Sequence, residues 1–184
     1  MSRPYYSRLM ASSRSFFLLV ISNREALGWI LSEQRMAFAP SRYKAVDALA
    51  QGDQLVLYST RGCFRNPTRD RGRVIGTAEV ASRLQAIESP VTFDHRVFDR
   101  GCAIRVERLV PADHGPELAD LVETLDTFPD SWHTHIRRTL VPLNEHDFAV
   151  LGQSLTEGNV GREAALPSYL SKISVRARQS ASTA

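Results

Sequence analysis

The densest group of charged side chains in the sequence is an arginine cluster in its first half. Its members are Arg61, Arg65, Arg69, Arg71 and Arg73, with Asp70 as the only acid among them. A guanidinium is planar and donates several hydrogen bonds, so it suits bidentate contacts with phosphates and stacking on bases. The cluster therefore favours contact with a phosphate-bearing polymer. A solvated loop, or a general bias toward arginine over lysine, would produce the same pattern.

A nucleophilic thiol is the only feature that suggests covalent chemistry. Cys63 lies between Arg61 and Arg65, whose charges are expected to lower the pKa of the thiol and raise its reactivity. No histidine can be placed beside it as a base. A nucleophile elbow, a phosphate-binding glycine loop and an HExxH motif are all absent from the sequence. We therefore predict that the protein has no catalytic residue and is not an enzyme.

Two histidines at alternate positions raise the question of a metal site. His133 and His135 could share one side of a strand, and Asp126 or Asp130 could add a carboxylate. No second pair of ligands occurs elsewhere at a metal-site spacing. We therefore predict no metal, and expect His133 to lie on a basic surface with Arg137 and Arg138.

The elements that must position these side chains are short. Apolar runs and alternation predict strands at 16–21, 54–59, 73–81 and 102–110, with an extended segment at 90–97. Helices are predicted after Ser22, where Glu25 would complete a capping box, after Pro40-Ser41 with Tyr43 pointing inward, over 117–125, and after Asn144. Regular βαβ crossovers are absent. The order indicates an α+β fold, a mixed β-barrel or curled sheet of about five or six strands with short helices around it.

Length and composition are those of a globular domain. The chain has 184 residues, of which 43% are hydrophobic and 23% charged, and its net charge is +3. The longest apolar run, 16–21, is too short to cross a bilayer or to form an export signal, so we expect no membrane and a cytoplasmic protein. Cys63 and Cys102 are then expected to be reduced thiols.

Both ends of the sequence are polar and basic. We expect a flexible arm at 1–14, the domain itself at 15–156, and a polar tail at 157–184. Leu166, Tyr169, Leu170 and Ile173 have helix-like spacing, so part of the tail is expected to dock. An exposed strand edge would allow a homodimer as well as a monomer.

Several segments, taken in order, also carry a family resemblance. They are Phe17–Glu25, Met36–Lys44, Ala48–Tyr58, Val74–Val80, Cys102–Leu109, Leu125–Phe128 with Trp132, and Leu143–Phe148. This order resembles the EVE domain, a PUA-like domain related to YTH and ASCH domains, over Arg14 to Leu155. The resemblance implies a PUA-like barrel with a pocket between the first helices and the sheet. It also implies recognition of nucleic acid without a cofactor.

The matched positions offer residues for a base-binding pocket, which needs ring faces, hydrogen-bonding groups and nearby cations. The candidate pocket residues are Asn23, Phe38, Tyr58, Thr60 and Trp132, and the candidate phosphate contacts are Arg65, Arg69, Arg73 and Arg137. Each has a structural alternative, since Asn23 can support a helix start and the rings can be core. Many relatives have Trp-Gly before the proline that matches Pro40. Here Phe38 would supply that ring, unless it faces the opposite way.

We therefore predict a non-catalytic module that binds RNA or modified DNA and holds a modified or flipped-out base in an aromatic pocket with an arginine-rich rim. Two other hypotheses stay open. The same cavity could serve a small-molecule sensor or enzyme that uses Cys63 or the histidines. Alternatively, the basic surface could bind an acidic protein, with the cavity filled by the protein's own side chains.

Overall fold

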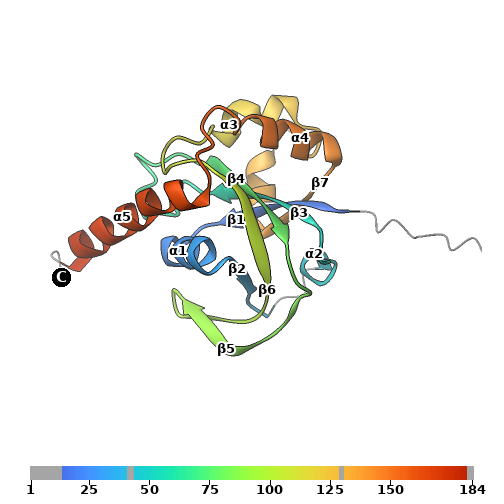
Figure 1. The fold of residues 1–184 in the computed structure, drawn as a ribbon. Coiled ribbons are helices and arrows are strands. Elements are labelled where there is room, and N and C mark those ends of the chain that lie inside the picture. The colour runs from blue at the N-terminus through green and yellow to red at the C-terminus, as the bar shows by residue number, and fades with distance from the viewer. Residues whose placement is uncertain (1–13, 41–43, 129–130, 182–184) are drawn as a thin grey trace, which may run out of the picture.

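Apolar runs and alternating apolar and polar stretches of the sequence become the strands of one curled, mixed sheet (Figure 1). The structure, a computed structural model, describes residues 14–40, 44–128 and 131–181, with side chains up to residue 174. Its strands are β1 (Phe16–Ile21), β2 (Arg35–Phe38), β3 (Gln54–Ser59), β4 (Arg73–Val80), β5 (Gln85–Phe93), β6 (Arg96–Leu109) and β7 (Leu140–Leu143). The predictions for Ser41, Tyr43, Asp130 and all of the 1–14 arm except Arg14 fall outside the described residues.

The sheet has the strand order β2-β6-β4-β3-β1-β7, and β5 pairs with β6. Strands β1 and β3 are parallel, and the other described pairs are antiparallel. The helices are α1 (Arg24–Glu33), α2 (Lys44–Asp47), α3 (Leu118–Leu121), α4 (Glu145–Gln153) and α5 (Arg162–Ala181), with 3-10 turns η1 (Val122–Thr124) and η2 (Trp132–Arg137). The sheet forms a half-barrel, which confirms the predicted α+β class.

Two hydrophobic cores lie on opposite sides of the sheet because successive strand residues point to opposite faces. Leu19 and Leu57 belong to the core under α1, α5 and β2. Leu18 and Val56, one position earlier on the same strands, belong to the core under α3 and α4. Figure 1 shows α1 and α2 on one side of β1 and β3, and α3 and α4 on the other. Each side chain on β3 therefore packs into one of the two cores and not the other.

The structure corrects several predicted element boundaries. Helix α1 is capped by Asn23 instead of Ser22, because the Asn23 Oδ1 atom accepts a hydrogen bond of 2.7 Å from the Ala26 amide. The predicted extended segment at 90–97 and strand at 102–110 are parts of a long β5–β6 hairpin. Strands β2 and β7 were not predicted, because each has four residues and little periodic signal.

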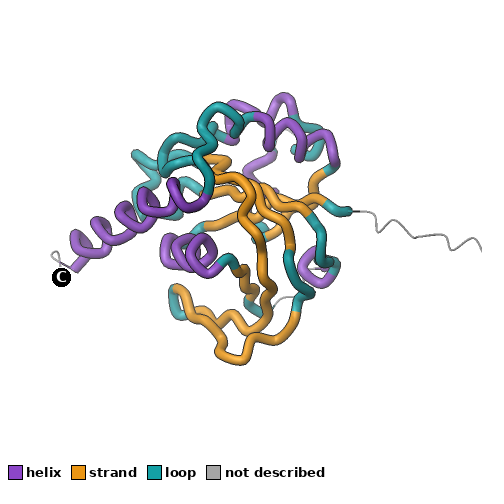
Figure 2. The backbone as a smooth tube through the Cα atoms, viewed as in Figure 1, coloured by secondary structure: helices purple, strands orange, loops and turns teal. Residues whose placement is uncertain are grey.

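Residues 162–181, predicted as a polar tail that docks in part, form helix α5, the long helix that leaves the sheet in Figure 2. Arg162 donates hydrogen bonds of 2.7 and 2.6 Å to the carbonyls of Leu31 and Ser32 at the end of α1. Tyr169 is 1% exposed, and its hydroxyl donates to the Val110 carbonyl at 2.8 Å. None of the helices in the described ranges combines the length and apolar character needed to cross a membrane.

Candidate functional site

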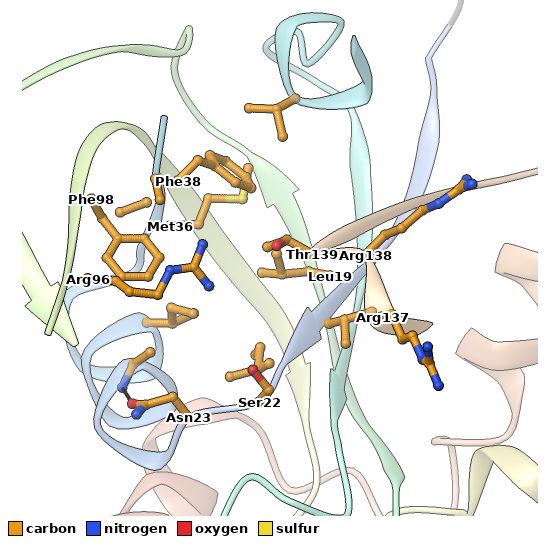
Figure 3. Close-up of a pocket in the computed structure, with 17 residues that line it drawn as sticks. Leu19, Ser22, Asn23, Met36, Phe38, Arg96, Phe98, Arg137, Arg138 and Thr139 are labelled. Atoms are coloured by element: carbon orange, nitrogen blue, oxygen red, sulfur yellow. Dashed lines mark hydrogen bonds between the residues drawn. The ribbon is translucent and has the colours of Figure 1, made fainter. Parts of the chain in front are cut away.

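A cavity of about 310 Å³ opens where β1 ends, between α1, β2, the β5–β6 hairpin and the segment before β7 (Figure 3). Its apolar and aromatic lining residues are Leu19, Val20, Ile21, Ala26, Ile30, Met36, Ala37, Phe38, Ala39, Val46 and Phe98. Its polar lining residues are Ser22, Asn23, Arg96, Arg137, Arg138 and Thr139. This volume lies at the lower end of the roughly 300–1,000 Å³ typical of ligand pockets. A cavity of this size suits a small ligand.

Two aromatic rings and one guanidinium give the cavity its chemical character. Phe38 on β2 is 4% exposed, and Phe98 on β6 is half-buried. Arg96 and Phe98 are two positions apart on one strand, so both side chains point to the same face. The guanidinium carbon of Arg96 lies 5.9 Å from the centre of the Phe98 ring. Figure 3 shows both side chains directed toward the space beside Phe38 and Met36.

Phe98 is held in place by other rings behind it. Phe93 on β5 meets Phe98 edge-on with ring centres 5.4 Å apart, and Trp29 on α1 lies 5.9 Å from Phe93. Edge-to-face contacts of this kind stabilise a particular ring orientation. The Phe98 ring is therefore a positioned surface on which another flat group can stack.

Arginines also stand at the mouth of the cavity, opposite the hairpin. Arg137 ends η2 and Arg138 follows it, and both are exposed. The next residue, Thr139, accepts a hydrogen bond of 2.8 Å at its carbonyl from the Val20 amide, which fixes this segment to β1. Figure 3 shows the two arginine side chains spreading in different directions from the segment beside β1. They place positive charge at the mouth of the cavity.

The turn of the hairpin is fastened across the cavity wall. Asp94 and His95 connect β5 to β6 with positive φ angles of 46° and 62°, the geometry favoured in two-residue hairpin turns. The Asp94 carboxylate accepts hydrogen bonds of 2.7 Å from the Asn23 amide and 2.5 Å from Arg65. Both ends of the Asn23 amide are therefore occupied within the protein. In this arrangement Asn23 and Arg65 hold the hairpin that carries Arg96 and Phe98.

Of the five candidate pocket residues, the structure brings Asn23 and Phe38 to the cavity and places the other three outside its lining. Tyr58 is buried in the opposite core, where burial raises the pKa of its hydroxyl to about 12, although the Arg61 charge lowers it. Thr60 follows β3, and its amide donates to the Ile21 carbonyl at 3.0 Å. Trp132 packs against that same opposite core and lies 4.0 Å, centre to centre, from the His133 ring.

Of the four candidate phosphate contacts, Arg137 alone lines the cavity. Arg73 is engaged within the fold, donating to the Gly115 carbonyl at 2.5 Å and to Glu117 at 3.3 Å. Arg65 pairs with Asp94, as described above. Arg69 is exposed on the loop, with its amide hydrogen-bonded to the Asn66 carbonyl at 3.1 Å. The cluster is thus partly structural and partly a solvated surface.

Sequence reasoning missed Arg96 and Phe98. The available signal was their alternation, which places a cation and a ring on one face of a strand. The segment was predicted to be extended only as far as Val97, so the long strand that unites the two residues was not recognised. Their position beside Phe38 depends on the pairing of β6 with β2, in which Phe38 lies opposite Arg100.

Comparison with known proteins finds no matching family model and no matching curated protein. Solved structures do share the architecture. The fold is similar to that of a YTH domain. The Mmi1 YTH domain superposes with a TM-score of 0.53 at 15% identity, over 78% of this chain and 89% of that chain. A structure of the Mmi1 YTH domain in complex with RNA gives 0.50 at 14% identity, over 78% and 81% of the two chains.

A hypothetical protein from Leishmania major gives a TM-score of 0.53 at 15% identity, over 80% of this chain and 98% of that chain. Identities this low establish a shared fold but do not establish a shared function. The resemblance to YTH-like proteins is therefore confirmed at the level of fold. Membership of the EVE family in particular stays a prediction.

The predicted activation of Cys63 is wrong. Cys63 is 1% exposed, and burial raises the pKa of its thiol to about 12, against the opposing charge of Lys172. Arg61 and Arg65, its neighbours in sequence, are both exposed instead of packed around the sulfur. Cys102 is also buried, with its pKa raised to about 12. Both thiols are protonated at neutral pH, which leaves them poor nucleophiles.

The histidines of the predicted metal alternative do not form a cluster in the described part of the chain. There, Asp126, His146 and Asp147 bring ligand atoms within 4.8 Å of one another. Asp147 is fully buried, and its two carboxylate oxygens each accept a hydrogen bond of 2.8 Å, one from the Asp126 amide and one from the Thr127 amide. These bonds fasten the segment after η1 to α4, so the carboxylate has a structural role.

Replacing Asp147 with asparagine is expected to cost about 2 kcal/mol of unfolding free energy, because an NH₂ group would face a backbone N–H. Burial alone would raise the pKa of Asp147, but hydrogen bonds from Thr127, Asp126 and His146 outweigh it and lower the pKa below 3.8. Because the pKa of Asp147 is lower in the folded than in the unfolded protein, its ionised carboxylate stabilises the fold at pH values above the unfolded pKa. This contribution is lost as the pH falls through the folded pKa. Urea unfolding should therefore show the two proteins converging below pH 3.8. A constant difference from pH 7 to acid would contradict this.

Proposed function

We propose that this protein is a non-catalytic nucleic-acid-binding module that holds one unstacked base, in RNA or modified DNA, in the cavity beside Phe38 and Phe98. The observation that carries the proposal is the combination of a positioned ring and a guanidinium inside one small cavity with further arginines at its mouth. A flipped-out or modified base presents the flat, polar-edged shape that such a cavity accommodates.

The chemistry of binding divides between the cavity and its rim. Stacking of a base on Phe98 contributes about 1–3 kcal/mol and is tolerant of sequence, because every base has an aromatic face. The hydroxyls of Ser22 and Thr139 and the guanidinium of Arg96 supply hydrogen bonds to the edge of the base. Arg137 and Arg138 then contact the phosphates next to the extruded nucleotide.

Two further observations support this proposal. A domain of similar fold, the Mmi1 YTH domain, has been solved in complex with RNA. In addition, burial raises the pKa of the Cys63 thiol and of the Cys102 thiol to about 12, so neither is activated for nucleophilic attack. We extend the proposal to an EVE-like domain over residues 15–156 in a cytoplasmic protein that acts as a monomer or homodimer.

Binding to a single-stranded oligonucleotide is expected to weaken with added salt, because each neutralised phosphate releases counterions. Two phosphate contacts on a single strand give a slope of about −1.4 in log K against log salt concentration. Fluorescence anisotropy with labelled RNA and DNA oligonucleotides measures it. The double variant Arg137→Gln with Arg138→Gln should flatten the slope. Arg83→Gln with Arg105→Gln, which removes the same charge from residues outside the cavity, should leave it unchanged.

The result that overturns the proposal is absence of binding at low salt by any unmodified or base-modified single strand. Binding whose slope is unaffected by the Arg137 and Arg138 changes would mean that the polymer lies elsewhere on the surface. Binding of a free small molecule in the cavity, with none of a polymer, would favour the sensor hypothesis.

A further inference from the structure

The charges around the cavity all have one sign. Arg96, Arg137 and Arg138 line it, and none of the described lining residues is an aspartate or a glutamate. The carboxylate that reaches this region belongs to Asp94, which is outside the lining and is bonded to Asn23 and Arg65. The charged side chains that line the cavity in the described residues are therefore all arginines.

The hydrogen-bonding groups have a corresponding bias toward donors. The Arg96 guanidinium can only donate, and Figure 3 shows it pointing into the cavity alongside Phe98. The Asn23 amide is held at both ends within the protein, because its oxygen accepts from Ala26 and its nitrogen donates to Asp94. The hydroxyls of Ser22 and Thr139 can adapt as either donor or acceptor. A ligand edge rich in acceptors, such as carbonyl oxygens and ring nitrogens, fits this set best.

We propose that the cavity selects a neutral, acceptor-edged ring, such as a keto base, and excludes bases that carry a positive charge, with Arg96 as the specificity-determining residue. This inference rests on the proposed function, since it defines which bases enter the same cavity. A cationic base, for example one methylated at a ring nitrogen so that the charge is fixed, would be placed next to the Arg96 guanidinium, with no carboxylate among the described lining residues to compensate its charge.

The size of the effect follows from Coulomb repulsion. Two like charges a few ångströms apart near a protein surface repel by an amount that salt and solvent reduce, which leaves a penalty of about tenfold in affinity or more. Attraction between the cation and the Phe98 ring works in the opposite direction, but Arg96 already occupies one approach to that ring. The Arg96 guanidinium thus competes with the cationic base for the Phe98 ring and also repels that base.

The test uses pairs of probes that differ in charge with little change in shape. One pair of single-stranded RNA oligonucleotides carries 1-methylinosine or 1-methyladenosine at the central position, of which 1-methyladenosine is cationic at pH 7. A second pair carries guanosine or cationic 7-methylguanosine. We expect the wild-type protein to bind the neutral member of at least one pair about tenfold more tightly in fluorescence anisotropy. The Arg96→Gln variant should reduce this preference to about twofold or less.

Arg83→Gln is the matched control, because it removes one exposed arginine that does not line the cavity. It shows how much of the preference comes from the overall charge of the protein acting on the single added charge of the oligonucleotide. This variant should keep the wild-type preference. Equal affinity within both pairs, or a preference that survives Arg96→Gln, would overturn the inference while leaving nucleic-acid binding intact. Failure of all four oligonucleotides to bind at low salt would instead reject the proposed function.

Discussion

Phe98→Leu is expected to weaken the binding of single-stranded RNA by about tenfold or more while the protein keeps its fold. Leucine retains an apolar side chain against Phe93 but has no ring face, so it removes the stacking contribution of about 1–3 kcal/mol. Because Phe98 is only half-buried, the cost in folding stability should be modest. Anisotropy titration and thermal unfolding of the same preparation separate the two effects.

Trp132→Leu provides the matched control, because it makes the same kind of change at a ring that the sequence had nominated for the pocket. Trp132 packs against the core on the far side of the sheet and does not line the cavity. We expect its replacement to lower the unfolding temperature and leave RNA affinity within about twofold of wild type. The reverse outcome, with affinity lost at Trp132 and kept at Phe98, would place the base on the other side of the sheet.

Tyr169→Ala is expected to give the largest loss of stability, about 3–5 kcal/mol, as for other truncations of buried aromatic side chains. Tyr169 fixes α5 to the rest of the protein, since it is 1% exposed and its hydroxyl bonds the Val110 carbonyl. Urea unfolding measures the effect. A loss below about 1 kcal/mol would mean that α5 contributes little to the folded domain.

Two milder changes define the source of that loss. Tyr169→Phe removes only the hydrogen bond and should cost about 1 kcal/mol. Leu170→Ala, at the adjacent position that is 40% exposed, should change stability by about 0.5 kcal/mol or less. Together they distinguish burial of the ring from the general effect of altering the helix.

The strands that sequence reasoning found have a strong local signal. β1 is a continuous apolar run and β3 contains one at its centre, and their observed bounds, Phe16–Ile21 and Gln54–Ser59, agree with the prediction. Strands β2 and β7 have four residues each, and Pro142 interrupts the pattern of β7. Short edge strands of this kind are fixed by pairing with β6 and β1, which no local pattern records.

The candidate site shows the same division. Asn23 and Phe38 were nominated from a resemblance that matched short segments in order, and both lie at the cavity. Tyr58 was nominated from its place on β3, but a shift of one position on a strand moves a side chain to the other face of the sheet. The pleat of β3 places Tyr58 in the opposite core, and no feature of the segment itself indicates which face borders the cavity.

The sequence by itself determined the α+β class and the principal strands. It also determined that the connections contain helix caps and turns, and that arginine outnumbers lysine. Each of these features can be recognised from the residue types and from residues close together in the chain. Only the tertiary structure decided which side chains share the cavity, that Arg65 and Asn23 hold a hairpin turn, and that Cys63 is protonated. The physical reason is that these properties depend on burial and on distances between residues far apart in sequence, from Asn23 to Asp94 or from Phe38 to Phe98. Both are set by how the sheet curls.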